Sequence, residues 1–121
     1  MISFAAGDVE RFLAEDDGEP IVMLNLLRFR PDGGRERYLE YLRMAGPLVE
    51  RYGAEIVFAG DGAAPLAAEP GQAWDTTALV RYPSRKAFAD MIADPDYEAA
   101  DQLRISALTE AVLQPLRSFK S

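Results

Sequence analysis

Nine consecutive residues, Ile21–Phe29, form an apolar run that only Asn25 and Arg28 interrupt. The run is too short for a typical long helix, and it is bounded by Pro20 and by the turn residues 31–34. A strand with one solvated face would alternate apolar and polar residues, whereas a strand buried on both faces need not alternate. We therefore predict a central strand that is covered on both sides.

The rest of the chain has helix and strand patterns in a regular order. Helical spacing of apolar residues predicts helices over 8–16 and 35–52, a third that Ser84 caps, and a fourth that begins at Asp94-Pro95. Strand patterns cover 54–60, 73–82 and 110–116, and 61–71 is the one long loop. After the leading helix the order is β-α-β-β-α-β, the split β-α-β type of α+β fold. Right-handed crossovers then predict a four-stranded antiparallel sheet in the order 4-1-3-2 with the helices on one face.

Two prolines and the chain length refine this prediction. Gly46-Pro47 lies inside the second helix, where a kink or a break is expected. Pro115 places the end of the last strand at an edge or a bulge. The 121 residues are near the commonest domain size and contain no internal repeat. We expect one domain over residues 1–121, with residues 1–19 as an N-terminal helical extension.

The sequence contains neither histidine nor cysteine. It therefore lacks the ligands of the usual zinc and copper sites, a histidine ligand for haem, and an imidazole for general acid–base catalysis. It also has no glycine-rich phosphate loop, calcium loop or serine nucleophile motif. We expect no metal and no cofactor, so any proton transfer would fall to Asp, Glu, Tyr, Lys or bound water.

The net charge is −7 and the isoelectric point is near 4.5. Such a surface repels phosphate backbones, and the arginines of 35–43 alternate with glutamates, so we expect no nucleic-acid binding. No apolar run approaches the roughly 20 residues that span a bilayer, so we expect no membrane association. Residues 1–11 lack the apolar segment of a signal peptide, and small secreted domains often contain disulfides. These features favour a cytoplasmic location.

Helices on one side leave the other face of the sheet uncovered. Alternate residues of the central strand point to opposite faces. The residues on the uncovered face are therefore either Val22, Leu24 and Leu26 or Met23, Leu27 and Phe29. An exposed apolar face of this size is a typical association surface, and two-fold pairing is the simplest closed arrangement. We expect a homodimer through the open sheet face. The alternative is that the leading helix and the long loop cover this face.

Three motifs occur in order along the chain: VMLNLLRFRPDG (22–33), WD (74–75) followed by VRYPS (80–84), and DPDY (94–97) followed by Arg104. With them the chain resembles the bacterial domain-of-unknown-function family 1330 over roughly residues 20–117. The resemblance implies a ferredoxin-like fold that pairs as a dimeric α+β barrel. It implies no activity, because related barrels include cofactor-independent monooxygenases, isomerases and haem proteins.

Polar residues at predicted pocket positions are candidates for ligand binding. Asn25 is a carboxamide between two leucines, and it either orients a ligand or bonds to the backbone of a helix end or loop, since an unpartnered buried amide costs about 1–3 kcal/mol. Arg28, Arg81 and Arg104 are suited to an anionic ligand such as a carboxylate. Arg104 either binds a ligand or pairs with Asp101 on its own helix face. Arg28 is equally explained as a solvated charge at a strand end.

Trp74, Asp75 and Tyr97 complete the candidate ligand-binding residues. Trp74 is a ligand platform or, more often, a core or interface residue. Asp75 acts as a general base, or it caps a turn or pairs with an arginine. Tyr97 donates a proton or a hydrogen bond, or it only closes the pocket.

Three functions are compatible with these features. The first is an enzyme without metal or haem, of oxygenase or isomerase type, that acts on a small organic acid or aromatic molecule. The second is a module that binds or senses such a ligand without chemistry, and the third is a purely structural dimer. A cavity of a few hundred Å³ that holds Asn25 with an arginine or a tyrosine would favour the first two.

Overall fold

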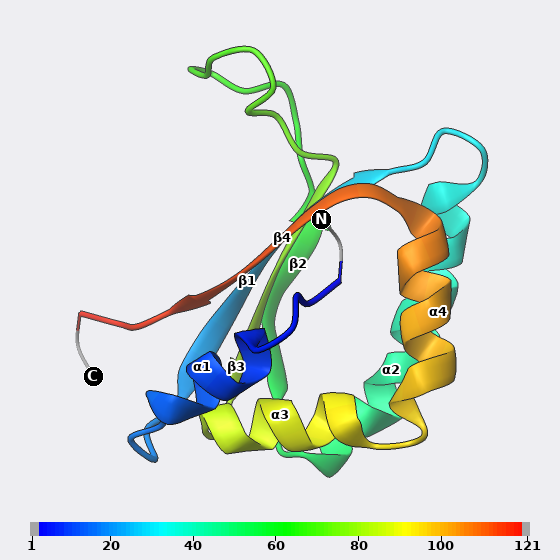
Figure 1. Cartoon of the computed structure of the whole chain (residues 1–121). Helices are drawn as coiled ribbons and strands as arrows, with labels where there is room; N and C mark the ends of the chain where they lie inside the picture. The colour runs from blue at the N-terminus through cyan, green and yellow to red at the C-terminus, as the bar shows by residue number, and fades with distance from the viewer. Residues whose placement is uncertain (1–2, 120–121) are drawn as a thin grey trace.

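The computed structural model describes residues 3–119, which form helices and strands in the expected order (Figure 1). The elements are α1 (Asp8–Ala14), β1 (Ile21–Phe29), α2 (Gly34–Arg51), β2 (Glu55–Asp61), β3 (Thr76–Tyr82), α3 (Arg85–Ala93), α4 (Tyr97–Ala107) and β4 (Leu108–Leu116). Within this part of the chain, none of the helices has both the length and the apolar character needed to cross a bilayer.

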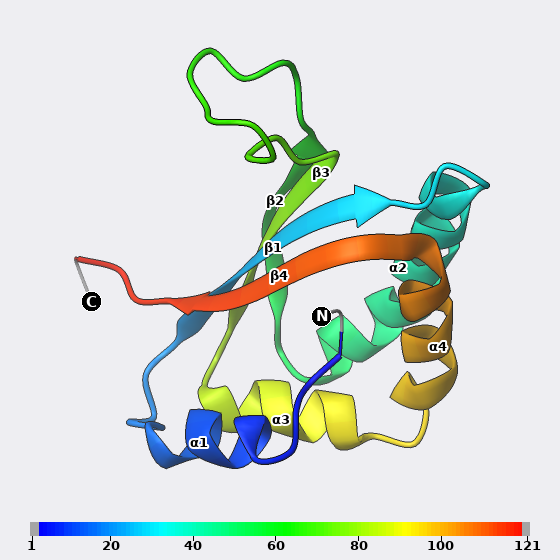
Figure 2. The same cartoon turned by 45° about the horizontal axis from the view of Figure 1, so that its top comes forward.

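The strands form one antiparallel sheet in the order β2-β3-β1-β4, which confirms the predicted 4-1-3-2 topology. β1 is central, paired with β3 on one side and with β4 on the other. The helices lie on one side of this sheet, with α2 against α4 and α1 against α3 (Figures 1 and 2). The fold is therefore the predicted ferredoxin-like α+β fold, preceded by the additional helix α1.

Packing determines which side each residue of β1 faces. Met23 and Leu27 are buried among residues of the helices, so Asn25 between them points to the same side. The intervening Leu24 and Leu26 point away from the helices and are only partly buried. The helices of one chain therefore cover only one face of the central strand.

Three strands begin at residues that differ from the prediction, and for β2 the difference is one residue, 55 in place of 54. β3 begins at Thr76 and not at residue 73, because the carbonyl of Ala73 accepts hydrogen bonds from the Arg28 side chain instead of from a neighbouring strand. Leu108 is the first residue of β4, which was predicted to begin at residue 110. It is buried in a cluster with Leu27, and this contact draws the chain into the sheet.

The two prolines have different outcomes. α2 continues through Gly46-Pro47, so the helix does not break there. A proline inside a helix costs about 3 kcal/mol. Ala45 and Leu48 are both buried, and their packing holds the helix together across this position. Pro115 lies on β4, which is an edge strand as predicted.

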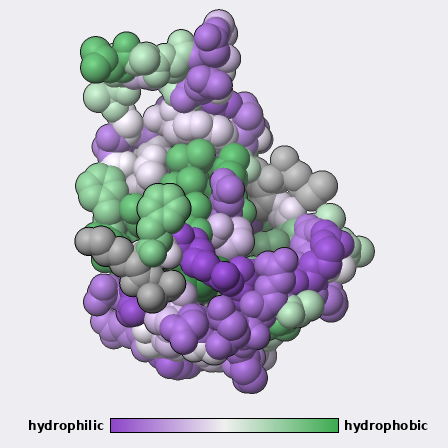
Figure 3. Space-filling view, turned by 90° about the vertical axis from the view of Figure 1, so that its left-hand side faces the viewer, coloured by the Kyte–Doolittle hydropathy of each residue, from purple (hydrophilic) through white to green (hydrophobic). Residues whose placement is uncertain are grey.

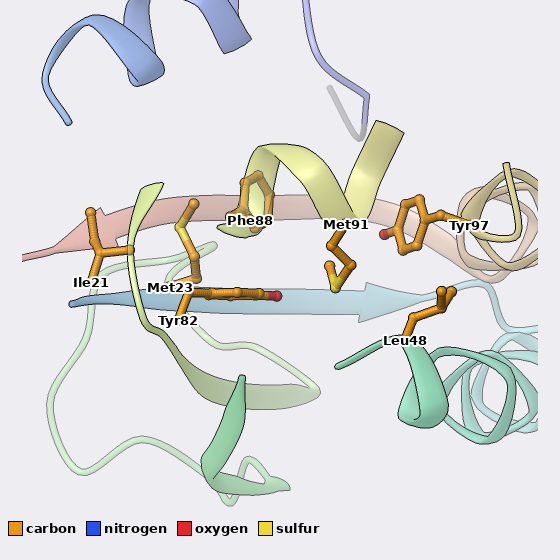
Figure 4. Packing of buried hydrophobic residues seen from close by; sticks show 7 residues of the cluster. All are labelled: Ile21, Met23, Leu48, Tyr82, Phe88, Met91 and Tyr97. Carbon is orange, nitrogen blue, oxygen red and sulfur yellow. The ribbon is translucent and has the colours of Figure 1, made fainter. Parts of the chain in front are cut away.

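The core consists of two clusters of buried side chains. The larger cluster contains Ile21, Met23, Leu48, Tyr82, Phe88, Met91 and Tyr97 (Figure 4). The smaller cluster contains Leu27, Tyr38, Ala107 and Leu108. Tyrosines occur in both clusters, and the hydroxyl of a buried tyrosine usually finds a hydrogen-bond partner. The partners of these hydroxyls therefore decide whether the core is simply packed or contains a site.

Candidate functional site

A cavity of about 450 Å³, here called the central cavity, lies between the sheet and the helices α2, α3 and α4. Its wall includes Leu27 and Ala78 from the sheet and Phe88 from α3, and it is mainly apolar. Residues 3–5 of the N-terminal segment lie at its edge. Ligand sites are usually apolar cavities of about 300–1,000 Å³ with a few polar groups. The central cavity falls within this range, so its polar groups are the candidate site.

Four of the five tyrosines line the central cavity: Tyr38 and Tyr41 from α2, Tyr82 from β3, and Tyr97 from α4. The hydroxyl oxygens of Tyr41 and Tyr97 lie 3.1 Å apart and share a hydrogen bond. Figure 4 shows the hydroxyls of Tyr82 and Tyr97 directed toward one another, with Met91 between them. Elements that are distant in sequence thus bring phenol groups to one space.

The hydroxyls of Tyr38 and Tyr82 make no hydrogen bond to any residue of the described range 3–119. Both residues are only 5% exposed. Neither oxygen is sealed inside the protein, because no fully enclosed side-chain oxygen or nitrogen of the described residues lacks a partner. A ligand in the central cavity would therefore be able to accept hydrogen bonds from both hydroxyls.

Burial keeps these phenols in the protonated form. It raises the pKa of Tyr38 to about 12, and it also raises the pKa values of Tyr41, Tyr82 and Tyr97. The Arg104 guanidinium acts in the opposite direction on the pKa of Tyr38, Tyr41 and Tyr97, but burial is the larger effect. At neutral pH the four tyrosines are hydrogen-bond donors and not bases.

Three of the seven candidate residues, Asn25, Tyr97 and Arg104, lie together at the central cavity. Nδ2 of Asn25 donates to the carbonyl oxygen of Met23 at 3.3 Å, and its carboxamide oxygen has no partner among the described residues. Nε of Arg104 donates to Asp101 at 2.9 Å. Arg104 therefore pairs with Asp101, which was one of the two alternatives from the sequence, and it also lines the central cavity.

Arg28 and Trp74 lie at a different place, at the end of β1. The Arg28 side chain donates to the carbonyls of Gly71 and Ala73. Its guanidinium carbon lies 4.1 Å from the centre of the Trp74 ring. These contacts fasten the loop between β2 and β3, which projects from the sheet in Figure 1. Neither residue lines the central cavity.

Asp75 holds the same loop. Its carboxylate accepts a hydrogen bond from the backbone N–H of Phe29 at 2.9 Å, and its own N–H donates to the carbonyl of Leu27 at 2.9 Å. Its carbonyl accepts from the N–H of Gly62 at 2.9 Å. Only glycine fits at position 62, because a Cβ there would lie 2.1 Å from the carbonyl oxygen of Trp74. Asp75 therefore acts here as a turn-capping residue.

Tyr38, Tyr41 and Tyr82 were not among the site residues predicted from the sequence. They occur at the spacing of apolar helix and strand faces, where a tyrosine is typical of a core. A usable signal was present, because most of the chain's tyrosines fall on such faces and each brings a hydroxyl that needs a partner. Only the packing shows which hydroxyls remain without one.

A second cavity of about 380 Å³ lies between α1, α3 and the sheet. Its polar centre is the buried Arg85, which donates to the carbonyl of Phe12 at 3.3 Å and lies 3.5 Å from the Glu15 carboxylate. The guanidinium also stacks on the Phe12 ring at 4.6 Å. These contacts join α1 to α3. Over residues 3–119, no three acidic side chains converge to form a metal site.

The model of the family described as Domain of unknown function (DUF1330) matches residues 33–114. The chain belongs to the DUF1330 family. The predicted resemblance is thus confirmed. No curated protein matches this DUF1330 chain.

Solved structures agree with the DUF1330 assignment. A protein of unknown function from Rhodopseudomonas palustris, RPA0582, is 35% identical with a TM-score of 0.92, and the match covers 99% of this chain and 98% of that one. A dimeric ferredoxin-like protein of unknown function from Jannaschia sp. CCS1 is 12% identical (TM-score 0.64; 82% and 99% covered). Hydroxynitrile lyase from Passiflora edulis is 11% identical (TM-score 0.67; 86% and 97% covered). The last two share the fold alone.

Proposed function

We propose that this DUF1330 protein binds a small organic acid or aromatic molecule in the central cavity and acts on it without a metal or cofactor, as an oxygenase- or isomerase-type enzyme. One observation carries the proposal: the buried hydroxyls of Tyr38 and Tyr82 have no partner within residues 3–119. Neither oxygen is sealed inside the protein, and both residues line the central cavity. A bound ligand that accepts from both hydroxyls would supply the partners that the described residues do not.

The chemistry of the wall supports a ligand that carries or develops negative charge. Phenols that stay protonated donate hydrogen bonds, and fixed donors in an apolar cavity stabilise charge better than water does. Arg104 adds a cation to the wall that holds Tyr97. A hydroxynitrile lyase of the same fold shows that this architecture accommodates an enzyme, although a fold does not name a reaction.

The alternative proposal is a module that binds or senses the ligand without turnover. It is favoured by the scarcity of a general base at the cavity. Among the described lining residues the one carboxylate is Asp8, at the edge, and it is paired with Arg11. Under this alternative the tyrosines only recognise the ligand.

Thermal unfolding with a panel of organic acids and aromatic compounds tests ligand binding. A ligand at about 100 times its Kd should stabilise the protein by about 2.7 kcal/mol. Tyr38→Phe and Tyr82→Phe should weaken this stabilisation, whereas Tyr52→Phe, which lies outside the cavity, should not. Product formation with the stabilising compounds separates the enzyme from the binding module. No stabilisation by any compound would contradict both.

We also propose that two copies pair in the cytoplasm through the open sheet face. Leu24 and Leu79 lie opposite each other on this face, and Phe58, paired with Leu79, is 55% exposed. Figure 3 shows hydrophobic surface gathered beside the projecting loop. The Jannaschia protein of the same fold is described as dimeric. The absence of cysteine favours the cytoplasm.

Light scattering at micromolar concentration tests the pairing. The wild type should have twice the 13.4 kDa mass of the chain. Leu24→Lys should yield monomers, because two-fold pairing would bury the new charge next to an apolar surface. Leu66→Lys, on the fully exposed part of the loop, is the control and should remain dimeric. A monomeric wild type would contradict the proposal.

A further inference from the structure

We propose that the central cavity recognises a phenolate or enolate oxygen, held by tyrosine hydroxyls instead of by an arginine fork. The substrate class is then phenols and enolisable ketones, bound in preference as their anions. The inference rests on the proposed ligand-binding function and specifies its chemistry.

The wall of the central cavity offers several tyrosine O–H groups as hydrogen-bond donors. Tyr38 and Tyr82 each present a hydroxyl that is not used within residues 3–119. The Tyr41–Tyr97 pair holds two protons, and the hydrogen bond between its oxygens uses only one of them. Up to three O–H donors from α2, β3 and α4 thus border one cavity. One oxyanion accepts two or three hydrogen bonds, which is the number of donors that this wall offers.

The charged groups around the cavity do not oppose an anion. Besides the four tyrosines, Arg104 from α4 and Asp8 from α1 are the ionisable side chains among the described lining residues, since β1 contributes Asn25 and α3 contributes apolar groups. Asp101 stands beside Arg104 and is paired with it. Asp8 is paired with Arg11 and accepts from the N–H of Ala5. Each nearby carboxylate is therefore matched by an arginine.

The same contacts favour a phenolate or enolate over a carboxylate. A carboxylate is bound best by two parallel N–H donors of one guanidinium. Nε of Arg104 already donates to Asp101, so that side of the fork is engaged. The remaining wall is mainly apolar and includes Phe88, which packs edge to face on Tyr82 at 5.1 Å. Flat aromatic rings suit such a wall, and the apolar surroundings strengthen each hydrogen bond to the anion.

Titration with p-nitrophenol tests the inference, because its phenolate is yellow and its neutral form is colourless. With saturating protein, the apparent pKa of the bound phenol should fall by about one unit, which corresponds to about tenfold tighter binding of the anion. Tyr38→Phe and Tyr82→Phe should each reduce this shift. Tyr52→Phe removes a phenol that hydrogen-bonds to Asp94 outside the cavity, so it is the matched control and should leave the shift unchanged.

Benzoate, measured by competition and by thermal shift, separates the possible failures. If p-nitrophenol binds with an unchanged or raised pKa, or if benzoate binds while phenols do not, the oxyanion inference is wrong and the cavity still binds ligands. If p-nitrophenol, benzoate and the wider panel all fail to bind the folded wild type, the proposed function itself is wrong. Near-ultraviolet circular dichroism confirms that each variant is folded.

Discussion

The hydroxyl oxygens of Tyr41 and Tyr97 lie 3.1 Å apart and connect α2 with α4 at the wall of the central cavity. The two rings meet edge to face, with centroids 6.5 Å apart and planes at 81°. This bond gives each of the two buried phenols a protein partner without a ligand. Tyr38 and Tyr82 have no equivalent contact within the described residues, so the four tyrosines fall into two classes.

The first class should show coupling in a double-mutant cycle. Tyr41→Phe and Tyr97→Phe each remove the hydrogen bond between the two hydroxyls, so we expect each to lower the free energy of unfolding by about 1 kcal/mol. The double variant removes both hydroxyls, and its loss should be smaller than the sum of the single losses. Urea unfolding of the four proteins measures the difference. Strictly additive losses would show that the hydroxyls do not interact.

Removal of the hydroxyl from Tyr38 or Tyr82, the second class, should not lower the free energy of unfolding. Tyr38→Phe and Tyr82→Phe remove hydroxyls that have no partner within residues 3–119, so the unfolding free energy of the ligand-free protein should be unchanged or rise by up to about 1 kcal/mol. The same urea experiment measures this. A loss as large as that of Tyr41→Phe would mean that these hydroxyls are already satisfied in the ligand-free protein.

All five tyrosines should resist ionisation in the native protein. Burial raises the pKa of Tyr38 to about 12 and also raises the pKa of Tyr41, Tyr82 and Tyr97, while a hydrogen bond to Asp94 raises the pKa of Tyr52. Tyrosinate absorbance near pH 10 should therefore be weaker in buffer than in concentrated urea.

The raised pKa values of the tyrosines also predict that the protein unfolds at alkaline pH. Because the native state holds phenol protons that the unfolded chain releases near pH 10, the stabilisation is complete below that pH and is lost as pH rises toward the native pKa values. Circular dichroism followed against pH measures the loss. Native-like tyrosinate formation at pH 10 without unfolding would contradict this picture.

Arg28 should control the loop between β2 and β3. Arg28→Met removes the hydrogen bonds to the carbonyls of Gly71 and Ala73 and the ion pair with Glu110, so we expect faster amide exchange in this loop and a stability loss of about 1–2 kcal/mol. The emission of Trp74, the only tryptophan, should shift to longer wavelength. Arg43→Met removes an ion pair on the surface of α2 and should change neither quantity.

Asp94 should make stability depend on acid pH. A hydrogen bond from the Tyr52 hydroxyl, at 2.7 Å, is the largest cause that lowers the pKa of Asp94, and Arg51 acts in the same direction. The stabilisation by the carboxylate is therefore present above the ordinary pKa near 4 and is lost as pH falls through the lowered native value. The difference in melting temperature between wild type and Asp94→Asn should be constant at neutral pH and shrink below about pH 4. Asp96→Asn, at a more exposed carboxylate, should show a smaller difference.

Local patterns were sufficient for much of the fold. The apolar run of β1 predicted a central strand, and the order of elements predicted the sheet topology that the structure has. The same patterns misplaced the start of β3, because the alternation continues through Trp74 and Asp75, although Arg28 holds the carbonyl of Ala73 and the N–H of Asp75 donates to Leu27 at the end of β1. A side chain that captures a backbone carbonyl leaves no periodic signal in the sequence.

The sequence by itself determined the ferredoxin-like topology and drew attention to Asn25, because both follow from the spacing and polarity of neighbouring residues. Only the tertiary structure decided which face of β1 borders the cavity, since both faces of that strand are equally apolar. It alone also brought Tyr38, Tyr82 and Tyr97 to one space and left two of their hydroxyls without partners among residues 3–119. Contacts between distant elements depend on packing distances and angles, which the periodicity of a sequence does not encode.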